Sequence, residues 1–319
     1  MKPKEILVFG ATGQIGRHLL RKLAKKNFKL TVVTRNLHRK AYILKSQANA
    51  GWLNIIELDS FNYEKLKQIF KNKDICINLI GILNQKSKNS FYNIHTLLPQ
   101  KLAELSKENN LEQFIHISAL GIENALQSKY ALSKINGEDE IKKIFKKYVI
   151  LKPSLVYSVD DKFTTMLFKI LKLFPIFPLY YKGKTIFYPI HVTDMCEIIE
   201  KVILNESNEE IIECIGPEKI SFKEIIKRLL KSLDIKRLLV PTPLFIAKIF
   251  ANFFEMTMKN PLLTKDQLIL LNYNNSPSGK YKTNVELKLN TNLKYFDNEI
   301  LKYSYAWKTG GEFSKKKNN

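Results

Sequence analysis

Short apolar runs alternate with helical patterns of apolar positions along the first half of the chain. The runs have the length and composition of buried strands, and the stretches between them carry apolar residues three and four positions apart, as amphipathic helices do. The predicted strands are Ile6–Phe9, Lys29–Thr34, Trp52–Leu58, Ile75–Ile80, Gln113–Ser118 and Tyr148–Pro153. The predicted helices are Gln14–Lys26, Tyr63–Phe70, Ile94–Glu108 and Ser128–Phe145. This alternation predicts an α/β fold with a Rossmann-type doubly wound parallel sheet, in which ligands lie at the carboxyl ends of the strands.

After about Pro153 the pattern loosens and predicts a smaller, mainly helical C-terminal lobe. Helices are expected at Phe163–Phe174, Thr193–Leu204, Ser221–Leu233 and Phe245–Met256, with a short strand at Glu210–Ile215. Ser221 and Glu224 have the spacing of a capping box. Apolar helices such as those around Phe168–Tyr181 and Phe245–Met256 are more often core than membrane contact, and both interpretations stay open.

These elements divide the chain into an α/β part and a lobe. We expect the Rossmann domain to comprise residues 1–157 and a returning segment at about 189–216. The lobe should comprise about 158–188 and 217–305. The end of the chain, 306–319, is expected to be a flexible tail, because its last residues, Lys315–Asn319, are only lysine and asparagine.

The charge of this 319-residue chain is strongly positive, at a formal +22. An excess of this size can indicate nucleic acid, an anionic membrane or a phosphate-rich ligand as partner. Only six of the 52 basic residues are arginine, however, and the lysines are spread along the chain, whereas proteins that read bases rely on arginine. We therefore expect no nucleic-acid partner, and peripheral membrane contact stays open.

The remaining composition restricts location and metal chemistry. The three cysteines (Cys76, Cys196, Cys214) are far apart, as in a protein of a reducing compartment, and the five histidines show no metal-ligand spacing. The strand pattern begins at Ile6 with no signal peptide before it, and no run reaches the length of a transmembrane helix. We expect a cytoplasmic protein without a metal or a transmembrane segment. A peripheral position on the cytoplasmic face of the inner membrane is compatible with this expectation.

A glycine-rich stretch, Gly10-Ala11-Thr12-Gly13-Gln14-Ile15-Gly16, follows the first predicted strand and opens the first helix. Gly10 permits a tight turn, Gly13 lets the backbone approach a pyrophosphate, and Gly16 permits close packing of the helix. The free N–H groups at the helix N-terminus bind anions. This context predicts a dinucleotide-binding loop rather than a structural turn.

The end of the second strand indicates which dinucleotide is bound. A carboxylate there would bind the ribose diol of NAD, but no Asp or Glu occurs from Ile6 to Ile56. The same span carries Arg17, Arg35, Arg39 and Lys40, and Arg35 lies where a 2′-phosphate is expected. NADP(H) is favoured over NAD(H). Asp59 is a candidate acceptor for the adenine amino group or, alternatively, the cap of the next helix.

A tyrosine and a lysine, Tyr130 and Lys134, lie four residues apart on one helix face. A tyrosine beside a cation can exchange a proton with a carbonyl or alcohol, and the lysine can hold the nicotinamide ribose. The same spacing occurs at Tyr63/Lys67, Tyr148/Lys152 and Tyr180/Lys184. Only the helix of Tyr130 follows the strand that is expected to face the cofactor.

Glycine loop, strand-end Ser118 and the Tyr130/Lys134 helix together resemble the extended and atypical short-chain dehydrogenases, which include the NAD-dependent epimerases and dehydratases. Four further sequence segments, at 78–83, 116–121, 152–157 and 261–267, resemble the corresponding segments of the NADPH-binding accessory subunits of respiratory complex I and their bacterial relatives. In that group the nucleotide is structural. The resemblance assigns a nucleotide contact to Gly10, Thr12, Gly13, Gln14, Ile15, Gly16, Arg35, Asp59, Ser60, Leu79, Ile80, Gly81, Tyr130, Lys134 and Pro153.

The resemblance leaves two functions open. One is an accessory protein that holds NADP(H) structurally and associates with respiratory NADH:quinone oxidoreductase, complex I. The other is an NADP-dependent reductase or epimerase acting on a quinone precursor, sugar or lipid through Tyr130 and Lys134. Active members carry a serine or threonine at the position of Ala119, and Ser118 is one residue early, so it should point to the other face of the strand. Ala119 favours the first function and the Tyr130/Lys134 pair favours the second.

Overall fold

A computed structural model describes residues 3–35, 37–49, 51–85, 90–258, 261–290 and 292–308. The chain forms two compact units, each assembled from three stretches of sequence. Unit 1 comprises Met1–Pro153, Val192–Cys214 and Pro277–Thr291, and unit 2 comprises Ser154–His191, Ile215–Ser276 and Asn292–Asn319. Most of the tail expected at 306–319 lies outside the described residues.

Unit 1 is built on a seven-stranded parallel sheet with the order β11-β6-β5-β4-β1-β2-β3. Its strands are β1 Lys4–Phe9, β2 Phe28–Thr34, β3 Leu53–Glu57, β4 Ile75–Asn78, β5 Gln113–Ile117, β6 Tyr148–Pro153 and β11 Glu210–Cys214. Its helices are α1 Gln14–Leu23, α2 Leu37–Lys45, α3 Tyr63–Phe70, η1 Tyr92–Leu97, α4 Leu98–Glu108, η2 Ile122–Asn124, α5 Lys129–Ile144 and α7 Val192–Leu204. The predicted doubly wound fold is confirmed.

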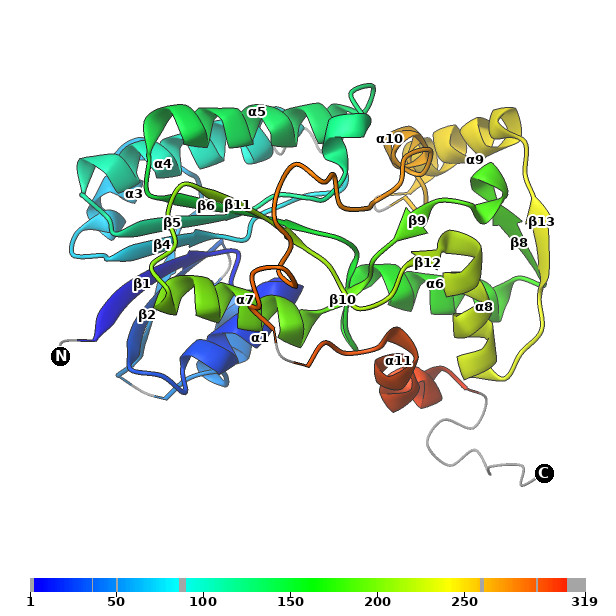
Figure 1. The fold of residues 1–319 in the computed structure, drawn as a ribbon, viewed down its shortest axis with the longest axis horizontal. Helices are drawn as coiled ribbons and strands as arrows, with labels where there is room; N and C mark the ends of the chain where they lie inside the picture. The colour runs from blue at the N-terminus through cyan, green and yellow to red at the C-terminus, as the bar shows by residue number, and fades with distance from the viewer. Residues whose placement is uncertain are drawn as a thin grey trace. The chain divides into compact units, whose positions relative to one another are not determined.

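Helices cover both faces of this sheet (Figure 1). On one face α3, α4 and α5 pack in a row, and their apolar residues meet those of the strands in a core that includes Phe9, Phe70, Leu102, Phe114 and Ile150. On the other face α1 packs beside α7. The chain leaves β1 in one direction and β4 in the other, so the sheet order reverses between these two neighbours, which is where such folds bind ligands.

Unit 2 is smaller and carries only short strand pairs. Its strands are β7 Val156–Tyr157, β8 Ile176–Leu179, β9 Ile186–Phe187, β10 Ile190–His191, β12 Ile220–Ser221 and β13 Leu238–Pro241. Its helices are α6 Lys162–Leu173, η3 Tyr180–Gly183, α8 Phe222–Leu233, α9 Leu244–Thr257, α10 Lys265–Leu270, α11 Phe296–Ser304 and η4 Tyr305–Trp307. A core of α6, α8 and α11 side chains, among them Phe168, Phe222 and Phe296, holds the unit together.

Two expectations for the C-terminal half need correction. The Ser221 side chain accepts from the Glu224 N–H at 3.2 Å, but the Glu224 carboxylate accepts from Arg228 instead of returning to the cap. The complete capping box belongs to Thr264 and Gln267 at the start of α10. The core interpretation of Phe245–Met256 is wrong, because within α9 only Ala247 and Ala251 are buried.

Candidate nucleotide and proton-transfer site

The glycine-rich turn joins β1 to α1 in unit 1. Gly10 has φ +82°, and a Cβ there would stand 3.0 Å from the Leu79 carbonyl carbon of the neighbouring strand end. At Gly16 a Cβ would lie 2.5 Å from Ala11 Cα, so α1 packs against its own turn. Gly13 is exposed, and no side chain caps the helix that it begins. The turn therefore has a backbone surface that admits a pyrophosphate and suits the anion.

The adjoining end of β4 continues this surface. The Leu79 N–H donates to the Phe9 carbonyl at 3.0 Å, and the Ile80 N–H donates to the Asn78 side chain at 3.1 Å. Gly81 follows and is exposed. A Cβ at Gly81 would be in ordinary contact with Lys134 Nζ at 3.8 Å and His95 Nε2 at 3.9 Å. The structure thus brings the β4 end together with the Tyr130/Lys134 helix.

Beside the second strand the structure adds an acidic group that the sequence argument missed. Arg35 is exposed immediately after β2. Glu57 ends β3 opposite Thr34, and its carboxylate accepts from the Leu37 N–H at 2.9 Å. The sequence-based prediction considers only carboxylates on β2, whereas the pairing of β2 with β3 places the Glu57 carboxylate beside the end of β2. A nucleotide held here could therefore meet Arg35, which suits a 2′-phosphate, and Glu57, which suits a ribose diol.

The other residues predicted to contact the nucleotide differ in their exposure. Asp59 and Ser60 are exposed, and the cap of α3 is Asn62 rather than Asp59, because the Asn62 side chain accepts from the Glu64 N–H. The Pro153 carbonyl accepts from Leu120 at 2.9 Å at the end of β6. Thr12 lies in the turn before α1, and Gln14 and Ile15 begin the helix; all three are half-buried. The side chains of Arg39 and Lys40 lie outside the described residues.

Tyr130 and Lys134 lie on α5, which begins where Ser128 caps the Ala131 N–H. The ammonium of Lys134 lies 5.9 Å from the centre of the Tyr130 ring and donates to the Ile117 carbonyl at 2.9 Å. Burial lowers the pKa of Lys134 to about 8, with Glu138 opposing and Lys152 adding to the shift. A buried cation beside a phenol favours the phenolate and so can assist proton transfer at Tyr130.

His95, on the π-helix η1, is a site residue that no sequence pattern indicated. Its Nε2 accepts from the Ile82 N–H at 3.1 Å, so the proton is on Nδ1, which donates to the Ser133 hydroxyl at 3.0 Å. Burial, with a smaller effect of Lys134, lowers the pKa of His95 to about 2. The imidazole is therefore a neutral clamp between the β4 loop and α5. Its ring also packs edge-on against Tyr130.

Ser118 does not join Tyr130 and Lys134 but hydrogen-bonds to Glu138. Its buried hydroxyl donates to the carboxylate of Glu138 on α5. Glu138 in turn pairs with Lys152 of β6 at 3.2 Å, and Lys152 also contacts Glu123. Burial alone would lower the pKa of Lys152, but the carboxylates of Glu138 and Glu123 outweigh it and raise that pKa. A catalytic role of Ser118 would require its hydroxyl to leave Glu138.

The competing tyrosine–lysine pairs lack this setting. The Tyr63 hydroxyl donates to Glu108, and this bond raises the pKa of Tyr63 to about 12. Tyr148 and Lys152 lie on strand β6, where the spacing does not place them on a helix face. Tyr180 and Lys184 flank a turn in which Tyr181 and Lys182 have positive φ. Position in the fold, and not spacing, distinguishes Tyr130 and Lys134.

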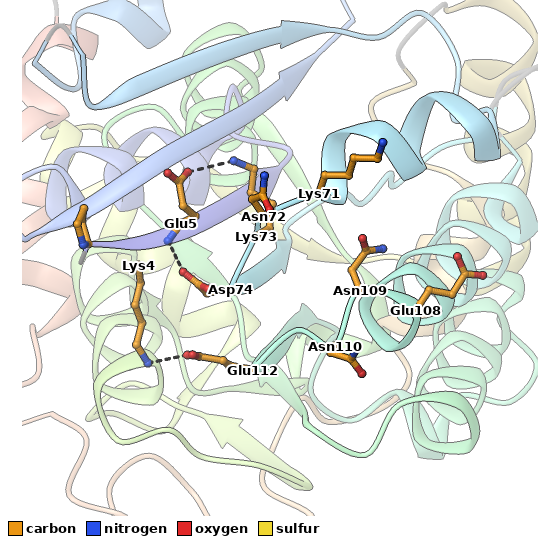
Figure 2. Close-up of a pocket in the computed structure, with 11 residues that line it drawn as sticks. Lys4, Glu5, Lys71, Asn72, Lys73, Asp74, Glu108, Asn109, Asn110 and Glu112 are labelled. Atoms are coloured by element: carbon orange, nitrogen blue, oxygen red, sulfur yellow. Dashed lines mark hydrogen bonds and ion pairs between the residues drawn. The ribbon is translucent and has the colours of Figure 1, made fainter. Parts of the chain in front are cut away.

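A hollow of about 840 Å³ lies at the other end of the parallel strands, around the N-terminal ends of β1, β4 and β5. Figure 2 shows charges there that are already paired: Lys4 with Glu112 at 2.8 Å, Lys73 with Glu5 at 3.0 Å, and Asp74 accepting from the Glu5 N–H. None of the residues of the glycine turn lines this hollow. We therefore place the candidate site at the glycine turn and not in this hollow.

Two absences hold for the described part of the chain. It contains no group of three or more His, Cys, Asp or Glu side chains arranged to hold a metal ion. Nor does it contain a helix with the length and apolar character that crossing a membrane requires.

Comparison with known proteins matches these features to a family. The chain is 24% identical over 262 residues to the mitochondrial NADH-ubiquinone oxidoreductase 40 kDa subunit of Neurospora crassa, covering 82% of this chain and 68% of that protein. It is 25% identical over 311 residues to the mitochondrial NADH dehydrogenase [ubiquinone] 1 alpha subcomplex subunit 9 of Dictyostelium discoideum, covering 96% and 86%.

A solved structure shares the fold. The dTDP-glucose 4,6-dehydratase DesIV of Streptomyces venezuelae, determined with NAD and TYD bound, superposes with a TM-score of 0.69 at 16% identity over 95% of this chain and 96% of DesIV. Residues 6–214, which include the glycine turn, Tyr130 and Lys134, match the NAD dependent epimerase/dehydratase family. The chain belongs to the NAD dependent epimerase/dehydratase family.

Proposed function

We propose that this chain holds NADP(H) in unit 1 as a structural group and is an accessory protein of a respiratory NADH:quinone oxidoreductase. The observation that carries the structural role is the hydrogen bond from Ser118 to Glu138. Active family members carry a serine or threonine at the position of Ala119. The hydroxyl of the adjacent Ser118 could replace it, but the hydrogen bond to Glu138 holds that hydroxyl away from the reaction. The proposed partner is supported by two relatives that are named as subunits of mitochondrial NADH:ubiquinone oxidoreductases.

The residues present fit a dinucleotide. The glycine turn would hold the pyrophosphate, the exposed Arg35 the 2′-phosphate, and Lys134 the nicotinamide ribose. Bound NADPH would supply a hydride. The chain's own residues would orient it: the His95 clamp fixes Gly81 beside Lys134, and the buried Glu138–Lys152 pair fixes the strand ends beneath α5.

The direct test is to denature the purified protein and identify the released small molecule by mass spectrometry. We expect NADP⁺ or NADPH in near-stoichiometric amount, and none from Gly13→Asp protein, whose added carboxylate repels phosphate. Release of NAD⁺ would contradict the cofactor assignment, and an empty protein would contradict a structural nucleotide.

The proposed partner and location require a separate experiment. Tagged protein from gently solubilised membranes should bring down subunits of an NADH:quinone oxidoreductase, as expected for a peripheral protein on the cytoplasmic face of the membrane. Protein found wholly in the soluble fraction, with no such subunit attached, would remove the partner from the proposal.

A second function is favoured by the approach of Lys134 to the Tyr130 ring. In that case the chain is an NADP-dependent reductase or epimerase, and the Tyr130 hydroxyl gives a proton to a carbonyl oxygen of a quinone precursor, sugar or lipid while Lys134 stabilises the phenolate. Loss of one oxyanion donor, as at Ala119, typically costs about 10²–10³ in rate. We expect negligible NADPH oxidation with such substrates; ordinary enzymatic rates that vanish in Tyr130→Phe would establish the enzyme instead.

A further inference from the structure

Helix α9 of unit 2 turns an apolar stripe outward. Phe245, Ile249, Phe253 and Met256 follow one another at intervals of four, four and three residues, which places them on one helix face. Their exposed fractions are large, 80% for Met256 and 64% for Ile249. The small residues Ala247 and Ala251 pack on the opposite side against Tyr180, Leu263 and Leu268. The helix is thus fixed to unit 2 by its narrow side and leaves its broad apolar side uncovered.

The β8–β13 pair, which like α9 contacts or adjoins η3, also carries exposed apolar residues. Figure 1 shows α9, β13 and β8 at the same end of unit 2. Ile176 and Leu238 are partners in the parallel pairing of the two strands, and both are more than half exposed. Leu173 and Phe174, at the end of α6, are exposed immediately before β8. Contiguous exposed apolar residues on this scale mark an interaction surface.

The sequence stretches that form this surface are strongly basic, and the one acid within α9, Glu255, accepts a hydrogen bond from the Lys265 N–H. Between Asp161 and Asp194 the chain contains no acidic residue, and it contains none between Asp234 and Glu255. These two stretches include α6, β8, β13 and nearly all of α9. They carry eight basic residues: Lys162, Lys169, Lys172, Lys182, Lys184, Lys236, Arg237 and Lys248. An apolar helix face flanked mainly by basic residues is the pattern of a helix that lies in an anionic lipid interface.

We propose that unit 2 docks on an anionic bilayer surface through α9 and the β8–β13 edge, with α9 lying in the interface plane. Phe245, Ile249, Phe253 and Met256 enter the acyl boundary, and Lys172, Lys236 and Lys248 contact lipid phosphates. A second copy of the chain fits less well, because a twofold interface pairs the same surface patch of both copies and would bring basic residues against basic residues.

The experiment is co-sedimentation of the full chain with vesicles of phosphatidylcholine alone or mixed with phosphatidylglycerol. We expect binding to the mixed vesicles that persists in high salt. Ile249→Ser combined with Phe253→Ser should lower the partition coefficient by about tenfold or more, because two exposed side chains lose their apolar transfer. The matched control changes two equally exposed leucines outside the surface, Leu204→Ser with Leu301→Ser, and should bind like the parent.

The basic residues are tested against a matched loss of charge elsewhere. Lys172→Gln, Lys236→Gln and Lys248→Gln together should weaken binding to the mixed vesicles. The same three-charge change on unit 1, at Lys65, Lys67 and Lys107, should have much less effect. Insertion is measured with Phe253→Trp, whose fluorescence should be quenched by lipids brominated in the acyl chain.

Three outcomes would overturn the proposal. One is equal binding by the Ile249/Phe253 variant and the parent, and another is fluorescence of the Phe253→Trp variant that brominated lipid leaves unquenched. The third is concentration-dependent self-association that the Ile249/Phe253 variant loses without any vesicle binding, which would identify a second copy as the occupant. The inference rests on unit 2 alone, so none of these results changes the nucleotide released from unit 1, and the two proposals fail separately.

Discussion

The two units depart from the usual placement of side chains in opposite ways. Unit 1 buries ionisable groups, namely Lys134, Glu138 and Lys152, beneath the end of its sheet. Unit 2 leaves phenylalanine, isoleucine and methionine on its surface along α9. A buried charge costs desolvation energy unless it is paired, whereas an exposed apolar side chain gains nothing from folding and marks an interaction surface. This difference matches the two proposals, a nucleotide bound by unit 1 and a lipid surface bound by unit 2.

Lys152→Met should have the largest effect, because it leaves the buried Glu138 carboxylate without its cation. Removing one partner of a buried ion pair typically costs about 3–5 kcal/mol. Chemical denaturation should show this loss, and the double change with Glu138→Gln should recover part of it. Lys142→Met, which breaks a half-exposed surface pair with Asp139, should cost less than about 1 kcal/mol. Equal effects at Lys152 and Lys142 would break the comparison, because the interior charges of unit 1 would then carry no special cost.

Gly137 of unit 1 and Gly216 of unit 2 each pack so closely on neighbouring backbone that a substitution by alanine should destabilise the unit. A Cβ at Gly137 would stand 1.9 Å from the His95 carbonyl oxygen, and one at Gly216 would stand 1.7 Å from that of Pro189. Each should lose about 1–3 kcal/mol or more of stability, since backbone must move. Only Gly137→Ala should also weaken nucleotide retention, because it displaces the His95 clamp. Nucleotide loss in both variants would show that the site is not confined to unit 1. Gly81→Ala, with no close contact, should fold normally.

Arg35→Ala should lower the affinity for NADPH by about 10- to 100-fold, the value of a hydrogen bond to a charged group. NADH serves as the internal control, since it lacks the 2′-phosphate and its affinity should not change. Glu57→Gln should shift preference further toward NADPH, because a negative charge beside the phosphate is removed. Fluorescence titration measures all three. Equal affinity of the parent protein for NADH and NADPH would contradict the role of Arg35.

Stability should depend on pH through Lys134. Its pKa is about 8 in the folded chain against an ordinary 10.5, so the unfolded chain binds the proton more tightly between these values. Stability therefore rises with pH across that window, by at most about 1.4 kcal/mol per pH unit. Below the window both states are protonated and the contribution is constant. Thermal unfolding of Lys134→Met should lack this rise relative to the parent. Parallel curves would show that Lys134 is not a desolvated cation.

Local patterns predicted the elements and motifs that depend on neighbours in sequence. The bounds of α3 and β6 agree with the predicted ones, and the glycine turn lies between β1 and α1 as its spacing requires. Helix α2 was missed, because Leu37–Lys45 shows only weak amphipathic periodicity. Strand pairs of two residues, such as β7 with β10, are too short to leave a periodic signal.

Other parts of the site depend on contacts between distant residues. His95 meets Ser133 across 38 positions, and Lys152 meets Glu123 across 29. No spacing rule finds either pair. The exposure of α9 was missed for a different reason: the helix is apolar on nearly every side, so periodicity cannot say which side is covered.

The three-stretch assembly of unit 1 also orders events in time as the chain emerges from the ribosome. The buried carboxylate of Glu213, at the end of β11, accepts the Ser278 N–H at 3.0 Å, and the Glu213 N–H donates to the Lys282 carbonyl. These bonds close a long loop of sequence, and such distant contacts form slowly. The last stretch of unit 1 is therefore synthesised only after most of unit 2. A chain halted before residue 277 would present β11 with an unsatisfied acid, a state that a chaperone or a protease can recognise.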